Sequence, residues 1–423
     1  MCEKYWDCWF PSRAFWVNKE EFIPSLVLRP TSTEKLSKVV KLAYEKGIPV
    51  VPYGGGTGLM GGSLARKGSI VIDLSRMNRI LEISKEDLRV KAEAGIKLSK
   101  LNRALSKEGL FLAHDPWSVS FATLGGSIAT NALGYLGAKY GSMGDQTLGL
   151  KVVLPDGDIL ETMNYNQASV GFDLKKLFIG TEGVFGIIAE ATVQIFPKKK
   201  RKILGYTFDE YEKGFELVLE LCDSNIDFVS LDFGGEYYEE KRVFLYLVLE
   251  GLEERMNFDA KLIDKISEKY GAKKMSGKES WSYWLNRHKI ANSRLRMKSK
   301  LLNPKKEFEL DYIHVNIPRG KVLEYRKECF EIAKKKGVYV VEDGVWHKPE
   351  LFSMVLYNPM NGNLKGALDE MLILAQKYKG AIEYCHGIGL KLAHLMGDGL
   401  EVVRRIKKAI DPKYIMNPGK EGL

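Results

Sequence analysis

A stretch of twelve residues, 51–62, contains six glycines and constrains the fold of this chain more than any other. It reads Val-Pro-Tyr-Gly-Gly-Gly-Thr-Gly-Leu-Met-Gly-Gly, and the apolar run that leads into it, 48–53, is typical of a buried strand. Glycines after a buried strand can present a concave row of backbone N–H groups, which suits a phosphate or pyrophosphate. The Gly-Lys-Ser/Thr ending of a P-loop is missing, and a strand pattern follows where the dinucleotide fingerprint requires a helix. The stretch predicts either a ligand-binding loop or a plain flexible connection.

Composition indicates an ordinary globular chain of two or three domains, with 423 residues, 45% hydrophobic and 28% charged. The five cysteines are scattered and form no Cys-x-x-Cys pair, which argues against a disulfide framework or a zinc finger. We therefore expect a reducing, cytoplasmic location. The net charge of +10 gathers in two basic clusters, 198–202 and 294–306. They predict either a solvated lysine surface or peripheral docking to the cytoplasmic face of an anionic membrane, and no nucleic-acid motif is present.

The first 198 residues alternate between helical and strand patterns. A capping box, 31–34, starts a helix that Gly47 ends, and strands are predicted over 48–53, 69–74 and 88–94. A second helix follows from Leu98 and ends at Gly109. Pro155-Asp156-Gly157 predicts a hairpin turn, and a glycine-spaced loop, 180–188, leads into a strand over 191–196. Helices should therefore pack on a sheet in this part of the chain.

The stretch 115–144 is rich in small residues and has no acidic residue between Asp115 and Asp145. We expect an irregular loop there, and long irregular loops in compact domains are usually functional. Small side chains with free N–H and hydroxyl groups would let a flat ligand lie against the backbone.

Together, the stretches 51–62, 115–144, 148–159 and 177–196 resemble the FAD-binding domain of the vanillyl-alcohol-oxidase, or PCMH-type, flavoproteins. The segments 73–79 and 411–420 agree with the glycolate oxidase and D-lactate dehydrogenase branch of that superfamily. The resemblance implies an α+β fold, in which a two-subdomain PCMH-type FAD-binding domain (1–198) is joined to an α+β cap with an antiparallel sheet (199–390). A C-terminal segment (391–423) would return to the FAD-binding domain.

The resemblance also implies the residues that bind FAD. The glycine loop should hold the pyrophosphate, the second stretch should line the flavin and ribityl chain, the third should contact adenosine, and Asn417 should approach the flavin. The residues concerned are Pro52, Gly54, Gly55, Gly56, Thr57, Gly58, Leu59, Gly61, Gly62, Pro116, Thr123, Gly125, Gly126, Ser127, Thr130, Asn131, Tyr140, Gly141, Glu182, Gly183, Gly186, Ile188 and Asn417. Relatives that tether the flavin often use a histidine in the glycine loop. Because Thr57 and its neighbours occupy that region here, we expect non-covalent FAD.

From Gly205 onward the sequence predicts a cap of strands and helices without glycine loops. Strands are expected over 242–249, 308–317, 338–341 and 351–357, and helices over 259–269, 321–335 and 364–378. By resemblance, the arginine of Trp284-Leu-Asn-Arg287 would clamp a substrate carboxylate.

The branch also carries a His-x-Gly-Asp-Gly-Asn-x-His motif whose two histidines, with a later glutamate, bind a divalent metal. This chain departs from the motif, because the matching region keeps His347 but has Met354 in place of the second histidine. Cys385 replaces the glutamate before His386. We expect no metal ion from this set, with a soft copper or zinc ion as the alternative.

His386 is the predicted base for the hydroxyl proton, with Lys391 beside it, Glu383 and Tyr384 as orienting neighbours, and His314 and His347 as weaker candidates. The predicted activity is oxidation of a small 2-hydroxy acid, such as glycolate or D-lactate, by hydride transfer to flavin N5. Quinone, electron carrier and oxygen remain open as electron acceptors. Two alternatives also remain open: another substrate, such as a sugar acid, alcohol or alkyl-glycerone-phosphate-like lipid, or an FAD subunit of a larger electron-transfer complex.

Overall fold

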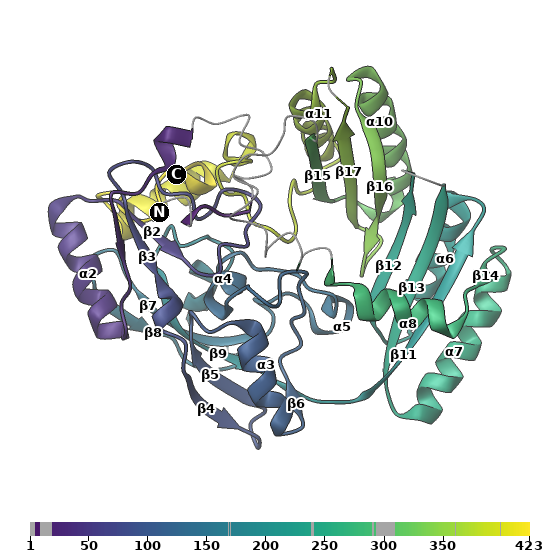
Figure 1. Ribbon diagram of the computed structural model, residues 1–423, viewed down its shortest axis with the longest axis horizontal. Coiled ribbons are helices and arrows are strands. Elements are labelled where there is room, and N and C mark those ends of the chain that lie inside the picture. Colours follow the sequence, from purple (N-terminus) through teal and green to yellow (C-terminus); the bar gives the residue numbers. More distant parts are fainter. Residues whose placement is uncertain are drawn as a thin grey trace.

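The computed structural model describes residues 5–8, 19–167, 169, 171–237, 241–289, 292, 309–359, 361–397 and 399–423. Two sheet-containing parts lie side by side, and the C-terminal segment crosses back to the part that contains the N-terminus (Figure 1). The predicted basic cluster 294–306 lies outside the described residues.

A small parallel sheet positions the glycine loop. Its strand order is β1-β3-β2, formed by Leu26–Leu28, Ile70–Asp73 and Val50–Tyr53. Helix α2 (Thr33–Lys46) precedes β2 and ends at Gly47, which adopts the left-handed conformation expected at a helix end. The helix begins one residue later than the predicted capping box implies, because the Ser32 hydroxyl, and not that of Thr31, accepts the first backbone N–H.

A five-stranded antiparallel sheet forms the second half of this part, in the order β4-β5-β9-β7-β8. Its strands are Ile80–Ser84, Arg89–Glu93, Ile187–Gln194, Thr147–Val153 and Ile159–Glu161. Helix α3 (Leu98–Lys107) buries Leu98, Leu101 and Leu105 against it. A two-stranded pair, β6 (Leu110–Phe111) with β10 (Phe196–Pro197), closes this part just before residue 198.

The cap is built from two βαββα units that share one seven-stranded sheet, in the order β14-β11-β13-β12-β16-β17-β15. The first unit comprises β11 (Lys200–Phe208), α6 (Tyr211–Asp223), β12 (Phe228–Glu236), β13 (Arg242–Gly251), α7 (Glu253–Glu268) and β14 (Lys273–Lys274). The second comprises β15 (Glu309–Asn316), α10 (Val322–Lys335), β16 (Tyr339–Trp346), β17 (Leu351–Asn358) and α11 (Leu364–Lys377). Strand pairing in this sheet is antiparallel, as predicted.

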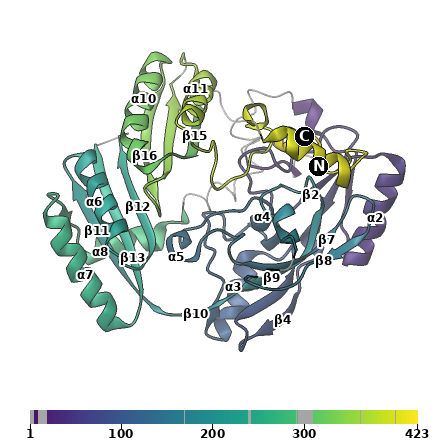
Figure 2. The same cartoon turned by 180° about the vertical axis from the view of Figure 1, so that it is seen from behind.

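The four long cap helices cover one face of the sheet and leave the other face toward the first part of the chain (Figures 1 and 2). Successive side chains of a strand point to opposite faces of a sheet, and two neighbours on β12 show the difference between the faces. Phe233 packs on Tyr211 and Phe215 of α6, whereas Asp232 accepts a hydrogen bond from Tyr283 of α8 (Gly277–Asn286) on the other face. A mixed aromatic and aliphatic cluster, including Phe111, Tyr135, Val248 and Trp284, packs the two parts together.

Helix α12 (Leu400–Ile410) ties the C-terminal segment to the first part of the chain. Its buried Lys407 donates to the carbonyl oxygens of Val184 and Met416 and to the Asp411 carboxylate, 2.6 Å away. Beyond it, Met416 forms a parallel bridge with Val50, and the Asn417 N–H bonds the Val50 carbonyl at 2.8 Å. The strand that leads into the glycine loop is therefore flanked by the C-terminal segment.

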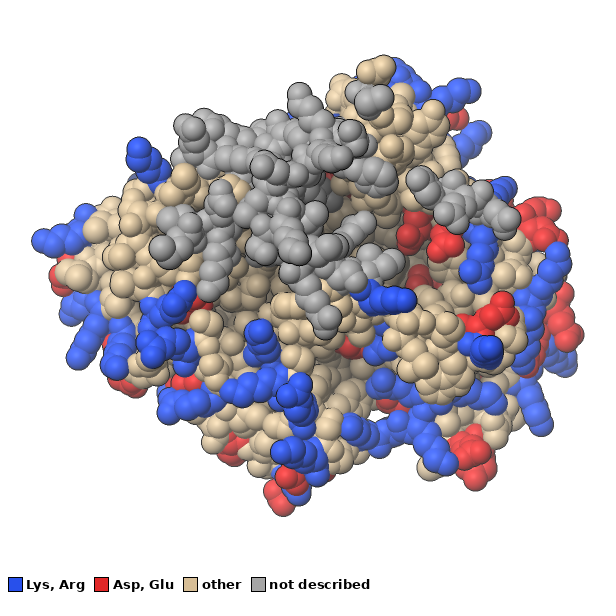
Figure 3. Space-filling model, viewed as in Figure 1, with Lys and Arg blue, Asp and Glu red and all other residues tan. Residues whose placement is uncertain are grey.

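Lysine and arginine side chains are spread over the face seen in Figure 3. Acidic side chains lie among them, and these acidic side chains are most numerous over the cap. In the described part of the chain, no helix is both long and apolar enough to cross a membrane.

Candidate active site

The glycine loop after β2 lies against the beginning of helix α4 (Leu124–Ala129) in the second predicted stretch. A Cβ atom on Gly55 would collide with the Phe121 carbonyl oxygen, and one on Gly62 would collide with the Glu182 carboxylate. The Thr123 hydroxyl accepts the Gly126 N–H and caps α4. Glycine is therefore required in this loop because other backbone and carboxylate groups approach it closely.

Two of the predicted cofactor stretches meet through backbone hydrogen bonds. The Gly180 and Glu182 N–H groups donate to the carbonyl oxygens of Ile128 and Ala129 at 3.0 and 2.8 Å. Asn131 Oδ1 accepts the Gly144 N–H at 2.9 Å. The helices α4 and α5 (Gly137–Tyr140) are short turns within a stretch predicted to be irregular throughout.

The C-terminal segment completes this assembly. Asn417 is fully buried, and its Nδ2 donates to the carbonyl oxygens of Gly62 and Glu182 at 2.9 and 2.6 Å. Asn131, Glu182 and Asn417 all have positive φ, of 47°, 50° and 42°. Such strained backbone concentrates at functional sites, and here it marks residues from three separate stretches that the sequence predicts to bind one cofactor.

Two groups that sequence reasoning did not assign also reach this place, the buried Lys420 and the half-buried Glu421. Lys420 Nζ donates to the Leu64 carbonyl oxygen at 2.8 Å, and burial lowers its pKa to about 8. Burial, together with the neighbouring Glu182 carboxylate, raises the pKa of Glu421 to about 9, and burial raises that of Glu182. At neutral pH the two carboxyl groups therefore hold a proton that can be donated.

These residues fit an anionic, flat cofactor. The loop between β2 and β3 supplies backbone donors, Lys420 supplies a buried cation beside it, and the small side chains of α4 leave the backbone accessible. Asn417 Oδ1 and Glu421 Oε1 are buried and have no hydrogen-bond partner among the described residues. Buried polar atoms of this kind are usually satisfied by a ligand or an ordered water.

Two of the predicted cofactor residues lie elsewhere. Tyr140 packs between Phe111 and Phe196, and its hydroxyl bonds Glu250 of the cap, so it belongs to the interface between the two parts. Ile188 points into the core of the five-stranded sheet and is 6% exposed. Both side chains pack against hydrophobic neighbours.

A second cluster, which we call the His–Cys cluster, comprises His314, Glu383, Cys385 and His386. His314 lies on β15, and the other three belong to the turn that follows α11. His314 Nδ1 is 3.1 Å from His386 Nδ1 and 3.3 Å from Cys385 Sγ, and Cys385 Sγ is 3.2 Å from His386 Nδ1. Glu383 Oε1 is 3.4 Å from His386 Nδ1. The four donor atoms all lie within 4.8 Å of one another, so they could hold a metal ion.

Glu383 organises the turn. Its Oε1 accepts the backbone N–H groups of Tyr384, Cys385 and His386 at 2.8–3.0 Å. Burial alone would raise the pKa of Glu383, but His386 and these N–H donors lower it to about 2. The prediction that Glu383 orients His386 agrees with this geometry, and Tyr384 stacks on His314 with ring centroids 5.4 Å apart.

The same turn contacts the cofactor loops. Glu182 Oε2 accepts the Gly389 N–H at 2.6 Å, and the Met60 carbonyl oxygen accepts the N–H groups of Leu390 and Lys391. Only two residues separate His386 from Gly389. The His–Cys cluster therefore lies where the cap meets the predicted FAD loops.

His347 and Met354, which match the metal motif of the branch by sequence, both lie outside the His–Cys cluster. His347 is buried, and its Nε2 bonds the Gly134 carbonyl oxygen at 2.9 Å. Met354 is fully buried in the core beneath the cap helices. His314, which the sequence marks only as a weaker candidate, is the histidine that joins Cys385 and His386.

The other two predicted catalytic residues are engaged in ion pairs. Arg287 donates through Nε and Nη2 to the Asp115 carboxylate at 2.9 and 2.6 Å and stacks on Trp284. It therefore ties the cap to the loop 115–144 instead of presenting a free carboxylate clamp. Lys391 is 2.8 Å from Asp311, and both side chains are buried, so its ammonium group holds the turn against β15.

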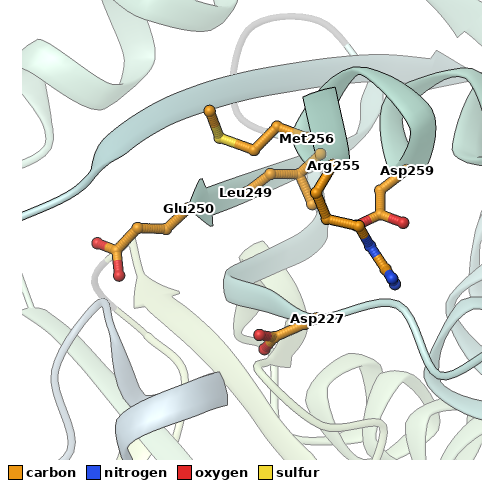
Figure 4. A pocket seen from close by; sticks show the side chains of 6 residues that line it. All are labelled: Asp227, Leu249, Glu250, Arg255, Met256 and Asp259. Atoms are coloured by element: carbon orange, nitrogen blue, oxygen red, sulfur yellow. The ribbon is translucent and has the colours of Figure 1, made fainter. Parts of the chain in front are cut away.

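A cavity of about 310 Å³ lies apart from these clusters, between β13 and α7 (Figure 4). Its carboxylates already have cationic partners. Asp227 pairs with Lys139, Glu250 with Arg201, and Asp259 with Arg255. We assign this cavity no role in the reaction.

Comparison with known proteins agrees with the architecture. Residues 24–163 match the family model described as FAD binding domain, and residues 215–421 match the one described as FAD linked oxidases, C-terminal domain. Among solved structures, 4-ethylphenol oxidase from Gulosibacter chungangensis superimposes with a TM-score of 0.78 at 18% identity, covering 99% of this chain and 92% of that one. An alkyldihydroxyacetonephosphate synthase gives 0.74 at 20% identity, covering 93% and 75%. These two likenesses concern the fold.

Two curated relatives match over nearly the full length. Glycolate oxidase subunit GlcD of Bacillus subtilis (strain 168) is 29% identical over 94% of this chain and 89% of its own. D-lactate dehydrogenase of Archaeoglobus fulgidus is 29% identical over 93% and 90%. Both domains of the fold, their order along the chain and these relatives agree with the prediction from the glycine loops. The chain belongs to the FAD-linked oxidases of the vanillyl-alcohol-oxidase and PCMH-type superfamily, in the glycolate oxidase and D-lactate dehydrogenase branch, and its cofactor is FAD.

Proposed function

We propose that this chain oxidises a small 2-hydroxy acid, of the size of glycolate or D-lactate, to the corresponding 2-oxo acid. The observation that carries the proposal is the position of the His–Cys cluster, whose turn bonds Glu182 among the cofactor loops through Gly389. The names of the two full-length relatives support this class of substrate.

Residues of the loop 54–62, α4, Glu182 and Asn417 would hold FAD without a covalent bond. FAD, when bound, supplies the acceptor for the hydride that leaves the hydroxyl-bearing carbon of the substrate. The protein must then remove the hydroxyl proton and orient the C–H bond toward the cofactor.

The His–Cys cluster would control that proton. The Nδ1 atoms of His314 and His386 face each other at 3.1 Å, so they cannot both carry a proton. An unprotonated imidazole nitrogen is thus turned into the cluster, beside the Cys385 thiol. Glu383 keeps the turn in place through its three backbone hydrogen bonds and balances positive charge that develops on His386.

The test is an anaerobic titration of the FAD-loaded protein with glycolate, D-lactate, L-lactate and D-2-hydroxyglutarate, followed by flavin absorbance. One of these acids should bleach the oxidised flavin persistently. His386→Gln should slow the bleaching by about 100-fold or more, whereas His394→Gln, at a 49% exposed histidine side chain outside the cluster, should leave it unchanged.

A flavin that none of the acids bleaches would refute the proposed substrate class. One relative then indicates a second candidate, because alkyldihydroxyacetonephosphate synthase of Caenorhabditis elegans is 32% identical over 47% of this chain, though only 34% of its own length. An enzyme that transfers an alkyl group to a glycerone-phosphate-like lipid would show no persistent reduction by a hydroxy acid.

We also propose that a second protein or a diffusible carrier reoxidises the flavin, since the Bacillus subtilis relative is by name a subunit. Rates of reoxidation by oxygen, quinone and artificial carriers, and co-purification with an electron-transfer protein, test this part separately.

A further inference from the structure

The branch motif implies a divalent metal held by two histidines and a carboxylate, and this chain offers a different donor set. Cys385 stands directly before His386, where the branch has its glutamate, and the carboxylate of the cluster is Glu383, two residues before Cys385. His314, Cys385 and His386 bring two imidazole nitrogens and one thiol sulfur together. A thiolate favours zinc or another soft ion over magnesium, calcium or manganese.

The distances fit one tetrahedral ion. With Zn–N of about 2.05 Å and Zn–S of about 2.3 Å, a tetrahedral site has N···N separations of about 3.3 Å and N···S separations of about 3.5 Å. The cluster has 3.1 Å between the two Nδ1 atoms and 3.2–3.3 Å from each to Cys385 Sγ. A small outward movement of the three side chains would therefore accommodate the ion.

Charge and burial fit as well. Glu383 Oε1 lies 3.4 Å from His386 Nδ1, and its side chain is 3% exposed. A divalent cation, the Cys385 thiolate and the Glu383 carboxylate sum to zero, so the cluster would be neutral when the ion is bound. Because Glu383 Oε1 already accepts three N–H groups, it orients two of the protein ligands through their backbone.

We propose that His314, Cys385 and His386 bind one zinc ion through two Nδ1 atoms and a thiolate, with Glu383 as the neutralising and orienting carboxylate. This rests on the proposed function and deepens it. With both Nδ1 atoms bound to zinc, the ion would take the place of a free imidazole nitrogen, because as a Lewis acid it would lower the pKa of a substrate hydroxyl group held at its open position. His347, which bonds the Gly134 carbonyl oxygen, takes no part.

Zinc binding is tested without any substrate. The FAD-loaded protein is treated with a chelator, supplied with one equivalent of zinc, freed of excess metal and analysed for zinc content and by zinc K-edge X-ray absorption. The expected result is one zinc per chain, with one sulfur scatterer at about 2.3 Å and nitrogen or oxygen scatterers at about 2.0 Å. Retention of no zinc, or a zinc shell without sulfur, would overturn the proposal.

Variants add an independent measurement. Cys385→Ser should weaken zinc binding by about 100-fold or more, since even residues behind metal ligands commonly contribute 10- to 100-fold. Cys222→Ser, at a half-buried cysteine on the outer helix α6, should bind zinc like the unchanged protein. Cys385→Glu, with a carboxylate in the position of the branch motif, should lose the sulfur scatterer and gain affinity for manganese relative to zinc.

The X-ray absorption of the unchanged protein decides the matter even if a variant fails to fold. It is also separate from the substrate proposal, because a sulfur-bound zinc with no bleaching by hydroxy acids would uphold the metal site and refute only the substrate class. Equal zinc affinity of Cys385→Ser and the unchanged protein would exclude the thiolate as a ligand.

Discussion

Substitution of Glu342 by glutamine should stabilise the cap at high pH and change little at low pH. Glu342 lies on β16 directly opposite Glu236 of β12, and Asp232 projects from the same face of the sheet. Burial, followed by the charges of Asp232, Glu236 and Asp343, raises the pKa of Glu342 to about 7. Like charges opposite each other on adjacent strands destabilise a sheet, so ionisation of Glu342 is unfavourable in the folded protein.

The sign and the size of this stability change follow from proton linkage. Between its unfolded pKa of about 4.5 and its folded pKa of about 7, Glu342 keeps its proton in the folded state and loses it in the unfolded state, so stability falls as pH rises through this window. Integration gives a loss of about 0.8 kcal/mol at pH 5 and about 3.3 kcal/mol at pH 8. Glu342→Gln removes this loss of about 2.5 kcal/mol between the two pH values.

The assay is denaturant unfolding of the cap, followed by tryptophan fluorescence at pH 5 and pH 8. Glu254→Gln, at an exposed position on α7, serves as the matched control and should show no such difference. If Glu342→Gln and the unchanged protein differ by the same amount at both pH values, the side chain is not held in the acidic face of the sheet as described, and the reasoning fails.

Three further predictions concern the links between the parts of the chain. Asn417→Gly keeps the positive φ but removes the side-chain bonds to Gly62 and Glu182, so it should weaken FAD binding by about 10- to 100-fold. The measurement is the flavin retained after gel filtration, and unchanged retention would contradict the role of Asn417. Lys407→Met breaks a buried ion pair and should cost about 3–5 kcal/mol of unfolding free energy, with faster hydrogen exchange over 400–417, whereas the exposed control Lys408→Met should not. Arg287→Lys loses the paired Nε and Nη2 bonds to Asp115 Oδ2 and should speed proteolytic release of the cap without altering the half-saturating hydroxy-acid concentration. A tenfold rise in that concentration would restore the substrate-clamp interpretation.

Local patterns predicted the elements that a few neighbouring residues determine. Helix α2 and the strands β2 and β3 match their predicted ranges within a residue or two at each end, because apolar spacing and Gly47 define them. The start of β11, just after the predicted domain break near residue 198, was not predicted as a strand. Its basic residues Lys200, Arg201 and Lys202 are exposed or half-buried, and burial begins at Ile203, so pairing with β13 decides its structure. The predicted strand 338–341 likewise ends too early, because the acidic residues Glu342 and Asp343 interrupt the apolar pattern of β16.

Contacts between distant residues limited the prediction of the site. His314 reaches His386 across 72 residues, and no spacing pattern distinguishes it from a strand histidine. Arg287 was predicted to bind the substrate carboxylate because of its neighbour Trp284, but its N–H groups bond Asp115, 172 residues away. The glycine loop, by contrast, could be recognised because close backbone approach imposes glycine at the sequence level, as Gly55 and Gly62 show.

The attachment of the C-terminal segment has a consequence for synthesis. Val50, at the entrance to the glycine loop, donates its N–H to Ile415 and accepts the Asn417 N–H, and these bonds can form only after some 365 intervening residues have been translated. The core of the cap, whose buried residues other than Met60 and Leu392 lie within residues 204–382, can fold on the ribosome before that happens. The nucleotide site is therefore expected to form last, so that the nascent protein would capture its flavin only after residues 400–417 have emerged and docked.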